Sequence, residues 1–192
     1  MYSSVFIYVC AICLFTMVLF CILAGIRYDG WVVFTHWNND LRIYNSHDIN
    51  TWKHYCFTFV TSTLVRVIYQ NGTAVAKDTA PAQYNGTGAL DIAYGANSLS
   101  SNLFGRLDEF KIYLRTLSAT DVLQLYKNQY CNNTALAIHY RFDRIKSNDT
   151  VLYDWNGNAR HALLVGTVPK WSTSNVPPSG PVAFQYSCKC VA

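Results

Sequence analysis

The chain has 192 residues, of which 15% are aromatic and only 14% are charged, with a formal net charge of +4. This composition argues against disorder, which needs high charge and few aromatic residues, and it suits β-strands. The basic residues are spread along the chain without a run, so a nucleic-acid partner is excluded as a working hypothesis. The length fits one domain with an appendage.

The N-terminal segment is apolar: from Val5 to Ile26 it carries no charged residue. About 20 such residues can cross a bilayer as a helix, so we predict a transmembrane or signal-anchor helix over residues 1–26. A buried core helix is the alternative, and it would need a larger surrounding protein. A retained anchor is favoured over a cleaved signal, because the apolar run is long and lacks a basic leader.

Sequons and cysteines favour an extracellular or lumenal location for the rest of the chain. N-x-S/T sequons predict glycosylation at Asn71, Asn85, Asn132 and Asn148. The cysteines outside the apolar segment are even in number, and they are candidates for disulfides: Cys56, Cys131, Cys188 and Cys190. Their pairing stays open, although Cys188 and Cys190 are too close to pair comfortably with each other.

After Gly30, short β-type runs alternate with turn signals. We expect strands at residues 31–37, 41–45, 54–60, 64–70, 73–77, 89–94 and 104–114. Asn71-Gly72 predicts a tight hairpin turn. In the last run the apolar side is supplied by Leu107, Phe110, Ile112 and Leu114. Many short strands with turns between them predict a sandwich or barrel.

One short helix interrupts the strands. Ser118 is a capping hydroxyl, and Asp121 places a carboxylate three residues later, which predicts a helix start. The apolar face of about two turns is then supplied by Val122, Leu123, Leu125 and Tyr126.

Several motifs resemble laminin G-like and pentraxin-like modules. The stretch from Trp52 to Thr58 is similar to their W-x-H-x-C-x-T strand, and residues 64–76 are similar to their N-G hairpin. Residues 105–113 resemble the G-x-i-D-E-v-r-i-y strand, and residues 117–126 the closing helix. The resemblance implies a concanavalin A-like jelly-roll sandwich of two antiparallel sheets over residues 27–135, with one short helix.

The segment 136–192 follows the closing helix. Residues 137–166 resemble the opening of such a domain, and two interpretations stay open. The segment begins a partial second laminin G-like repeat, or it supplies strands that complete the first domain, where an unpaired sheet edge would be a liability.

Catalysis is not indicated, and no catalytic residue is assigned. A glycoside hydrolase needs two carboxylates flanking one bond, but the chain has a single Glu, Glu109, next to Asp108. Strand neighbours point to opposite faces, so these two cannot act together. His54 and Cys56 could suggest a thiol nucleophile, but the resemblance implies structural roles for both, with the cysteine in a disulfide.

A calcium site is the metal hypothesis. Asp154, Asn156 and Asn158 offer side-chain oxygens at alternate positions around Gly157, and Asp108 could add a carboxylate. The alternative is a tight turn whose side chains cap their own backbone. No zinc-like spacing occurs among His36, His47, His139 and His161.

The sequence therefore predicts an extracellular or lumenal binding module that recognises a glycan or an extracellular protein, and that meets the membrane through its N-terminal segment. Tyr94, Tyr113 and the tryptophans are candidates for a sugar-stacking platform, with Trp52 assigned to the core. A structural or adhesive spacer without a small ligand is the alternative, and a glycosidase is a distant one. An exposed aromatic cluster would favour ligand binding.

Overall fold

In the computed structural model, the predicted β-type runs form strands at the expected places: β3 (Trp31–His36), β4 (Asp40–Tyr44), β5 (Trp52–Val60), β6 (Val65–Gln70), β7 (Thr73–Thr79) and β9 (Gly105–Tyr113). The run at 89–94 is represented by β8 (Asp91–Ile92). The structure describes residues 5–13, 22–26, 30–36, 39–44, 52–83, 91–92, 105–127, 133–142, 150–164 and 188–190. Tyr94 lies outside these residues.

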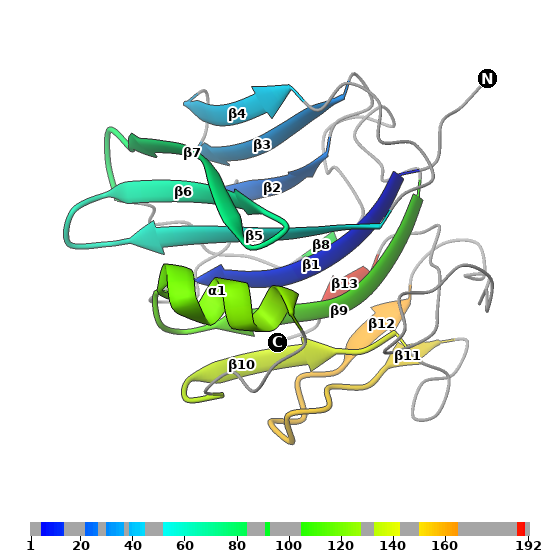
Figure 1. The fold of residues 1–192 in the computed structure, drawn as a ribbon. Helices are drawn as coiled ribbons and strands as arrows, with labels where there is room; N and C mark the ends of the chain where they lie inside the picture. Colours follow the sequence, from blue (N-terminus) through cyan, green and yellow to red (C-terminus); the bar gives the residue numbers. More distant parts are fainter. Residues whose placement is uncertain are drawn as a thin grey trace.

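The described strands form three sheets. Six of them make one sheet in the order β10-β9-β1-β5-β6-β7, where β1 is Val5–Cys13 and β10 is Leu136–Tyr140. A three-stranded sheet joins β2 (Ile22–Ile26), β3 and β4. A four-stranded sheet contains β8, β11 (Val151–Leu152), β12 (Ala162–Leu164) and β13 (Cys188–Cys190). Figure 1 shows the single described helix on the near face of the six-stranded sheet.

The N-terminal segment differs from the helix predicted for it, since both of its described parts are strands. β1 lies between β5 and β9 and pairs in parallel with both, whereas the other described strand pairs are antiparallel. A continuous apolar run is typical of a strand in the centre of a sheet as well as of a helix, and β-branched and aromatic residues favour the strand. In the parts of the chain that are described, no helix is long and apolar enough to span a membrane.

The main hydrophobic core lies between the sheets. Strands of all three sheets contribute side chains to one buried cluster, in which Phe34, Phe57, Ile92, Phe110 and Leu152 are at most 5% exposed. Phe34 and Phe57 meet edge to face, with ring centroids 5.6 Å apart. Removing these apolar side chains from water is the main driving force for stacking the layers. The predicted all-β fold of antiparallel sheets with one helix is therefore confirmed, whereas the described strands form three sheets rather than the two that were predicted, and β1 pairs in parallel.

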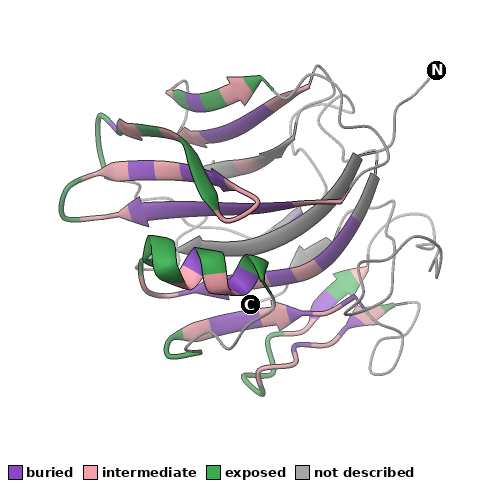
Figure 2. Cartoon of the chain, viewed as in Figure 1, coloured by how far each residue is buried: buried purple, intermediate pink, exposed green. Residues whose placement is uncertain are grey.

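The helix α1 (Ala119–Tyr126) covers a second, smaller core on the other face of the six-stranded sheet. Ser118 and Asp121 form the predicted capping box: the Ser118 hydroxyl accepts a hydrogen bond from the Asp121 amide, and the Asp121 carboxylate accepts one from the Ser118 amide. Val122 and Leu125 are buried against the sheet, whereas the outer side of the helix is exposed (Figure 2).

The hairpin turn between β6 and β7 fits closely under this helix. Asn71 and Gly72 have φ of 50° and 79°, which matches the tight turn predicted for an Asn-Gly pair. A Cβ atom at Gly72 would lie 3.0 Å from Leu123 Cδ1 and 3.1 Å from Tyr126 Cδ1. Glycine is therefore required both for the backbone conformation and for the close approach of α1.

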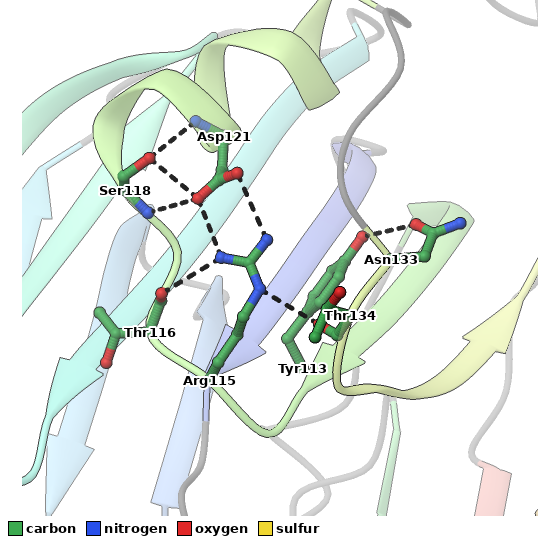
Figure 3. Close-up of polar contacts among 7 residues, drawn as sticks. All are labelled: Tyr113, Arg115, Thr116, Ser118, Asp121, Asn133 and Thr134. Carbon is green, nitrogen blue, oxygen red and sulfur yellow. Dashed lines mark hydrogen bonds and ion pairs between the residues drawn. The ribbon is translucent and has the colours of Figure 1, made fainter.

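Arg115 links the start of α1 to the turn that precedes β10 through hydrogen bonds (Figure 3). Its guanidinium donates to both carboxylate oxygens of Asp121, over 3.0 and 3.3 Å, and to the Thr134 carbonyl over 3.1 Å. The hydrogen bonds that Asp121 accepts, first from Arg115 and then from Ser118, lower the pKa of Asp121 to about 2. The start of the helix is thus tied to the segment that leads into β10.

The buried Arg66 joins the layers at the other end of the sandwich. Its side chain is fully buried and pairs with Asp78 on the neighbouring strand, with Nε 2.9 Å from Oδ1. Nη1 also donates to the carbonyls of Phe34, at 3.2 Å, and Asn39, at 2.8 Å. A buried guanidinium requires such a full set of acceptors, so Arg66 links β6 and β7 to the sheet of β3 and β4.

The predicted apolar side of β9 contains a break in its alternation, because Leu107 and Phe110 are three residues apart. The structure explains the break: Glu109 has φ of 51°, and the register between β1 and β9 shifts after Asp108. This bulge keeps Leu107, Phe110 and Ile112 in the main core. It also turns Glu109 and Lys111 toward the face that carries α1.

The strands β10, β11 and β12 contribute side chains to the same core as the strands before them. β10 pairs with β9, and Ala137, Ile138 and Tyr140 belong to the main core. Leu152 and Ala162 pack into that core as well. These contacts are those expected if the segment completes the first domain, and the division of the chain into domains stays a prediction.

Candidate functional site

The loop from Asp154 to Asn158 is the predicted calcium site. Asp154 Oδ1 accepts hydrogen bonds from the amides of His139, at 2.9 Å, and Asn156, at 3.2 Å. Asp154 Oδ2 accepts one from the Arg160 amide at 3.3 Å. Asn156 Oδ1 accepts one from the Asn158 amide at 2.9 Å. The structure thus brings the side chains of Asp154, Asn156 and Asn158 together in one turn, and this turn is hydrogen-bonded to β10.

The side-chain oxygens of Asp154 and Asn156 accept hydrogen bonds from the chain's own backbone, as the alternative of a self-capped turn predicts, and the calcium site stays a prediction. The side-chain Nδ2 atoms of Asn156 and Asn158 both donate to the Leu136 carbonyl, which fixes the turn against β10. Asp108 lies on β9, buried, with Oδ1 accepting from the Glu109 amide at 2.9 Å. Within the described residues, no group of three or more His, Cys, Asp or Glu side chains could hold a metal ion. The self-capped turn is the better description of this loop.

The predicted modification sites are placed only in part. Asn71 forms the hairpin turn, and its Oδ1 accepts a hydrogen bond from the His54 amide at 3.1 Å. The other sequons, at Asn85, Asn132 and Asn148, lie outside the described residues. Cys56 is fully buried on β5, Cys188 and Cys190 are on β13, and Cys131 is outside the described residues. Glycosylation and disulfide formation at these positions stay predictions.

The His54 and Cys56 pair lies beneath the helix in the second core. His54 is 4% exposed and Cys56 is 0% exposed. Burial, together with the nearby charge of Lys111, lowers the pKa of His54 to about 3. A neutral, enclosed imidazole beside an enclosed thiol cannot reach a substrate, so this pair has a packing role.

A polar cluster that was not predicted from the sequence lies on the face of β9 and β10 beside α1. Glu109 Oε2 is 2.8 Å from both Lys111 Nζ and His139 Nε2, and Glu109 Oε1 is 3.5 Å from Arg141 Nε. The signal was present in the sequence: charged residues at alternate positions of two strands share one face when those strands pair.

Glu109 is held ionised in this cluster. Burial acts against its charge, but the hydrogen bond from His139 and the charge of Lys111 outweigh burial and lower the pKa of Glu109 to about 2. A carboxylate of this kind cannot donate a proton near neutral pH, so it is unsuited to act as a general acid.

A partly exposed aromatic platform lies on the outer face of the three-stranded sheet: Arg42 and Tyr44 are exposed, Trp31 is half-buried, and Val33 on the same face is buried. Val32, Phe34 and Leu41 point into the core, so alternation directs Trp31, Arg42 and Tyr44 outward. The Trp31 and Tyr44 rings, opposite each other on β3 and β4, have centroids 5.1 Å apart. The Arg42 guanidinium carbon lies 4.9 Å from the Trp31 ring centroid. Tyr44 is 57% exposed, the largest value among the described large hydrophobic side chains.

Of the residues predicted to stack on sugars, the tryptophans include Trp31, which belongs to the platform, whereas the other described candidates lie elsewhere. Tyr113 is fully buried under α1, and Trp52 packs against the same second core, as predicted for Trp52. Trp155 is half-buried beneath Arg141. The grouping of Trp31 with Arg42 and Tyr44 was not predicted, because β3 has a nearly continuous apolar pattern, from which its outward face cannot be read without knowing the partner strand.

Sheets of mainly antiparallel strands that pack around one core, with one short helix, define a lectin-like β-sandwich. The sequence model of the concanavalin A-like lectin/glucanases superfamily matches residues 25–123, just over half of the 192-residue chain. The chain therefore belongs to this superfamily, and the family predicted from the motifs at Trp52 and Gly105 is confirmed. No significant match was found among curated proteins or among solved structures.

Proposed function

We propose that this chain is a carbohydrate-binding module of the extracellular or lumenal side, and that a saccharide binds to the outer face of β3 and β4. The observation that carries the proposal is the platform of Trp31, Arg42 and Tyr44. An exposed aromatic ring matches the apolar face of a pyranose, and a neighbouring guanidinium donates to its hydroxyl groups. The sheet positions these side chains rigidly, which lowers the entropic cost of binding.

Binding is favoured over catalysis by the state of the acidic side chains. Glu109 stays ionised, because the groups around it lower its pKa to about 2. Asp108 and Asp154 are buried, and their oxygens accept hydrogen bonds from backbone amides. These carboxylates do not supply the acid and base pair that glycoside hydrolysis needs.

The proposed location rests on the sequons and on the even number of cysteines outside the apolar segment, rather than on an N-terminal helix. Expression through a secretory pathway, followed by enzymatic removal of N-glycans, tests it. The account expects a loss of apparent mass on deglycosylation, which is reduced when Asn85, Asn132 and Asn148 are changed to Gln. A chain that never acquires glycans would contradict the location.

The binding site is tested with a panel of neutral oligosaccharides and the Tyr44→Ala variant. Removing one stacking ring is expected to weaken binding about tenfold while leaving the melting temperature unchanged. Tyr126→Ala is the matched control, because Tyr126 is another exposed tyrosine, 42% exposed, on α1. Equal loss in both variants, or no binding of any saccharide by the parent chain, would contradict the proposal.

A protein-binding or adhesive role is the second candidate, and one observation favours it. Three exposed apolar side chains occur on α1 and β7: Val75 at 41%, Leu123 at 38% and Tyr126 at 42%. Leu123 and Tyr126 also border the hairpin turn at Gly72. In a cell-adhesion assay, a defect in Tyr126→Ala with intact behaviour of Tyr44→Ala would favour this second role.

A further inference from the structure

We propose that the sequon at Asn71 carries an N-glycan whose first N-acetylglucosamine ring packs on Leu123 and Tyr126, and that this glycan covers the exposed apolar face of α1. That a glycan is attached at all rests on the extracellular or lumenal location proposed above. That the glycan lies on α1 rather than in solvent rests on the geometry of the hairpin turn between β6 and β7.

The turn that contains the sequon lies directly against α1 (Figure 1). A Cβ atom at Gly72, the middle residue of the sequon, would lie 3.0 Å from Leu123 Cδ1 and 3.1 Å from Tyr126 Cδ1. Asn71 is the residue before this contact, in the same tight turn, with φ of 50°. A group attached to the Asn71 side chain therefore begins one residue away from the contact with the helix.

The side chain of Asn71 is held in place by its neighbour on β5. Oδ1 accepts a hydrogen bond from the His54 amide at 3.1 Å, and the Asn71 amide donates to the His54 carbonyl at 2.9 Å. The His54 ring in turn contacts the Tyr126 ring, with centroids 5.7 Å apart. Glycosylation takes place at Nδ2 and leaves Oδ1 as an acceptor, so the sugar is attached to a side chain that stays fixed beside Tyr126.

The side chains that the sugar would cover are apolar and exposed. Tyr126 is 42% exposed and Leu123 is 38% exposed, and Val75, two residues beyond the end of the sequon on β7, is 41% exposed. A tyrosine ring matches the apolar face of a pyranose, and a saccharide packed here removes apolar surface from water. This occupant is supplied by the chain's own sequon, unlike the protein partner of the second candidate function.

The attachment itself needs an oligosaccharyltransferase and a lipid-linked oligosaccharide, which a secretory pathway supplies. The bond that forms joins Asn71 Nδ2 to the anomeric carbon of N-acetylglucosamine, and the bond that breaks joins that carbon to the pyrophosphate of the lipid donor. The pyrophosphate leaves with the bonding electrons, and one proton of Nδ2 passes to a base of the transferase. Thr73, which completes the sequon, is exposed.

The first measurement is the mass of the full chain after expression through a secretory pathway, with the remaining sequons removed by changing Asn85, Asn132 and Asn148 to Gln. Enzymatic deglycosylation of this variant is expected to lower its mass by that of one N-glycan. In the same background, Thr73→Ser keeps the sequon and the glycan, whereas Thr73→Ala loses the glycan and leaves Asn71 itself unchanged.

The mass measurement separates the proposal from the location on which it rests. If the parent chain loses mass on deglycosylation but the variant with only the Asn71 sequon does not, the location stands and the proposal is overturned. If the parent chain carries no glycan, both are overturned.

The second measurement compares melting temperatures with and without the Asn71 glycan. The glycosylated Thr73→Ser chain is expected to melt about 2–4 °C above Thr73→Ala, because the sugar packs on the helix only when the chain is folded. Adding Tyr126→Ala to both chains is expected to abolish this difference. Leu163→Ala is the matched control, since it removes another exposed apolar side chain, 45% exposed, from β12, and it is expected to preserve the difference.

Comparing the two glycoforms within each background cancels any loss of stability that Tyr126→Ala causes by itself. A difference that persists in Tyr126→Ala, or that is absent when Tyr126 is present, would show that the glycan projects into solvent. Either result would overturn the proposal and leave the exposed face of α1 to a protein partner.

Discussion

Arg66 and Arg42 show how burial divides the polar groups of this molecule into two kinds. Arg66 lies between the sheets with no exposed side-chain surface, and its guanidinium is surrounded by acceptors from β3, β7 and Asn39. Arg42 lies on the outer face of the adjoining sheet, exposed and stacked on Trp31. The buried arginine is fully used by the fold, whereas the exposed one is held in place by an aromatic ring and is accessible to a ligand.

The same division separates the loop at Asp154 from the platform. The loop contains the residue types expected for a ligand site, yet its oxygens accept backbone hydrogens. The platform contains ordinary strand residues, yet its Tyr44 ring is 57% exposed and Trp31 beside it is only half-buried. Residue type alone therefore identifies the functional face less well than the bonding state of each polar group.

The largest expected effect follows from changing Arg66. Arg66→Leu leaves the Asp78 carboxylate and the carbonyls of Phe34 and Asn39 without their donor, so the free energy of unfolding is expected to fall by about 3 kcal/mol. Chemical denaturation measures the change. The half-exposed Arg115 serves as the comparison, and Arg115→Leu is expected to cost only about 1 kcal/mol. An equal cost for the two substitutions would contradict the difference drawn between buried and exposed arginines.

The loop at 154–158 gives the next effect. Asp154→Ala removes the acceptor of three backbone amides and is expected to lower the free energy of unfolding by about 2 kcal/mol. Because those amides occupy the carboxylate, adding calcium or a chelator to the parent chain is expected to leave the melting temperature unchanged. A rise in melting temperature with calcium, lost in Asp154→Ala, would restore the metal site.

Buried groups also set the acid sensitivity. The folded pKa of His54 is about 3, below its usual 6.5, so the unfolded chain binds a proton that the folded chain does not. Stability is then greatest above about pH 6.5 and falls with decreasing pH, by up to about 1.4 kcal/mol per pH unit. Glu109, with its pKa lowered from 4.5 to about 2, adds a loss in the same direction below about pH 4.5.

Denaturation of His54→Gln at several pH values separates the two groups. The variant is expected to keep nearly constant stability between about pH 6.5 and pH 4.5 and to lose it only in stronger acid, where Glu109 titrates. A parent chain whose stability does not change over this upper range would show that His54 is not held neutral by burial.

The smallest expected effect on stability follows from changing a residue of the platform. Arg42→Gln removes an exposed cation that stacks on Trp31, and it is expected to change the free energy of unfolding by less than about 0.5 kcal/mol. Its effect should fall on saccharide binding instead. A large loss of stability would mean that Arg42 belongs to the fold rather than to the site.

Local signals in the sequence predicted much of the sandwich. The alternation in β4, the Asn-Gly turn at Asn71 and the cap at Ser118 each depend on neighbouring residues only, and all three form as expected. The apolar segment from Val5 failed as a helix prediction, because a strand that pairs on both sides has the same composition as a spanning helix.

The candidate sites could be predicted less well, because they depend on pairing between strands. Trp31 and Tyr44 become neighbours only through the register of β3 with β4, and Lys111 meets His139 only through that of β9 with β10. Asp154 could be assigned to calcium from its neighbours, but the amide of His139 that occupies its carboxylate is 15 residues away. Such contacts are not encoded in local patterns.

The most direct test of the central claim is the fluorescence of Trp31 during titration with the neutral oligosaccharide that binds best. The account predicts a change in tryptophan emission that saturates in the parent chain and disappears in Trp31→Phe, with affinity weakened about tenfold. A signal and an affinity that persist unchanged in Trp31→Phe would place the saccharide elsewhere and contradict the assignment of the platform.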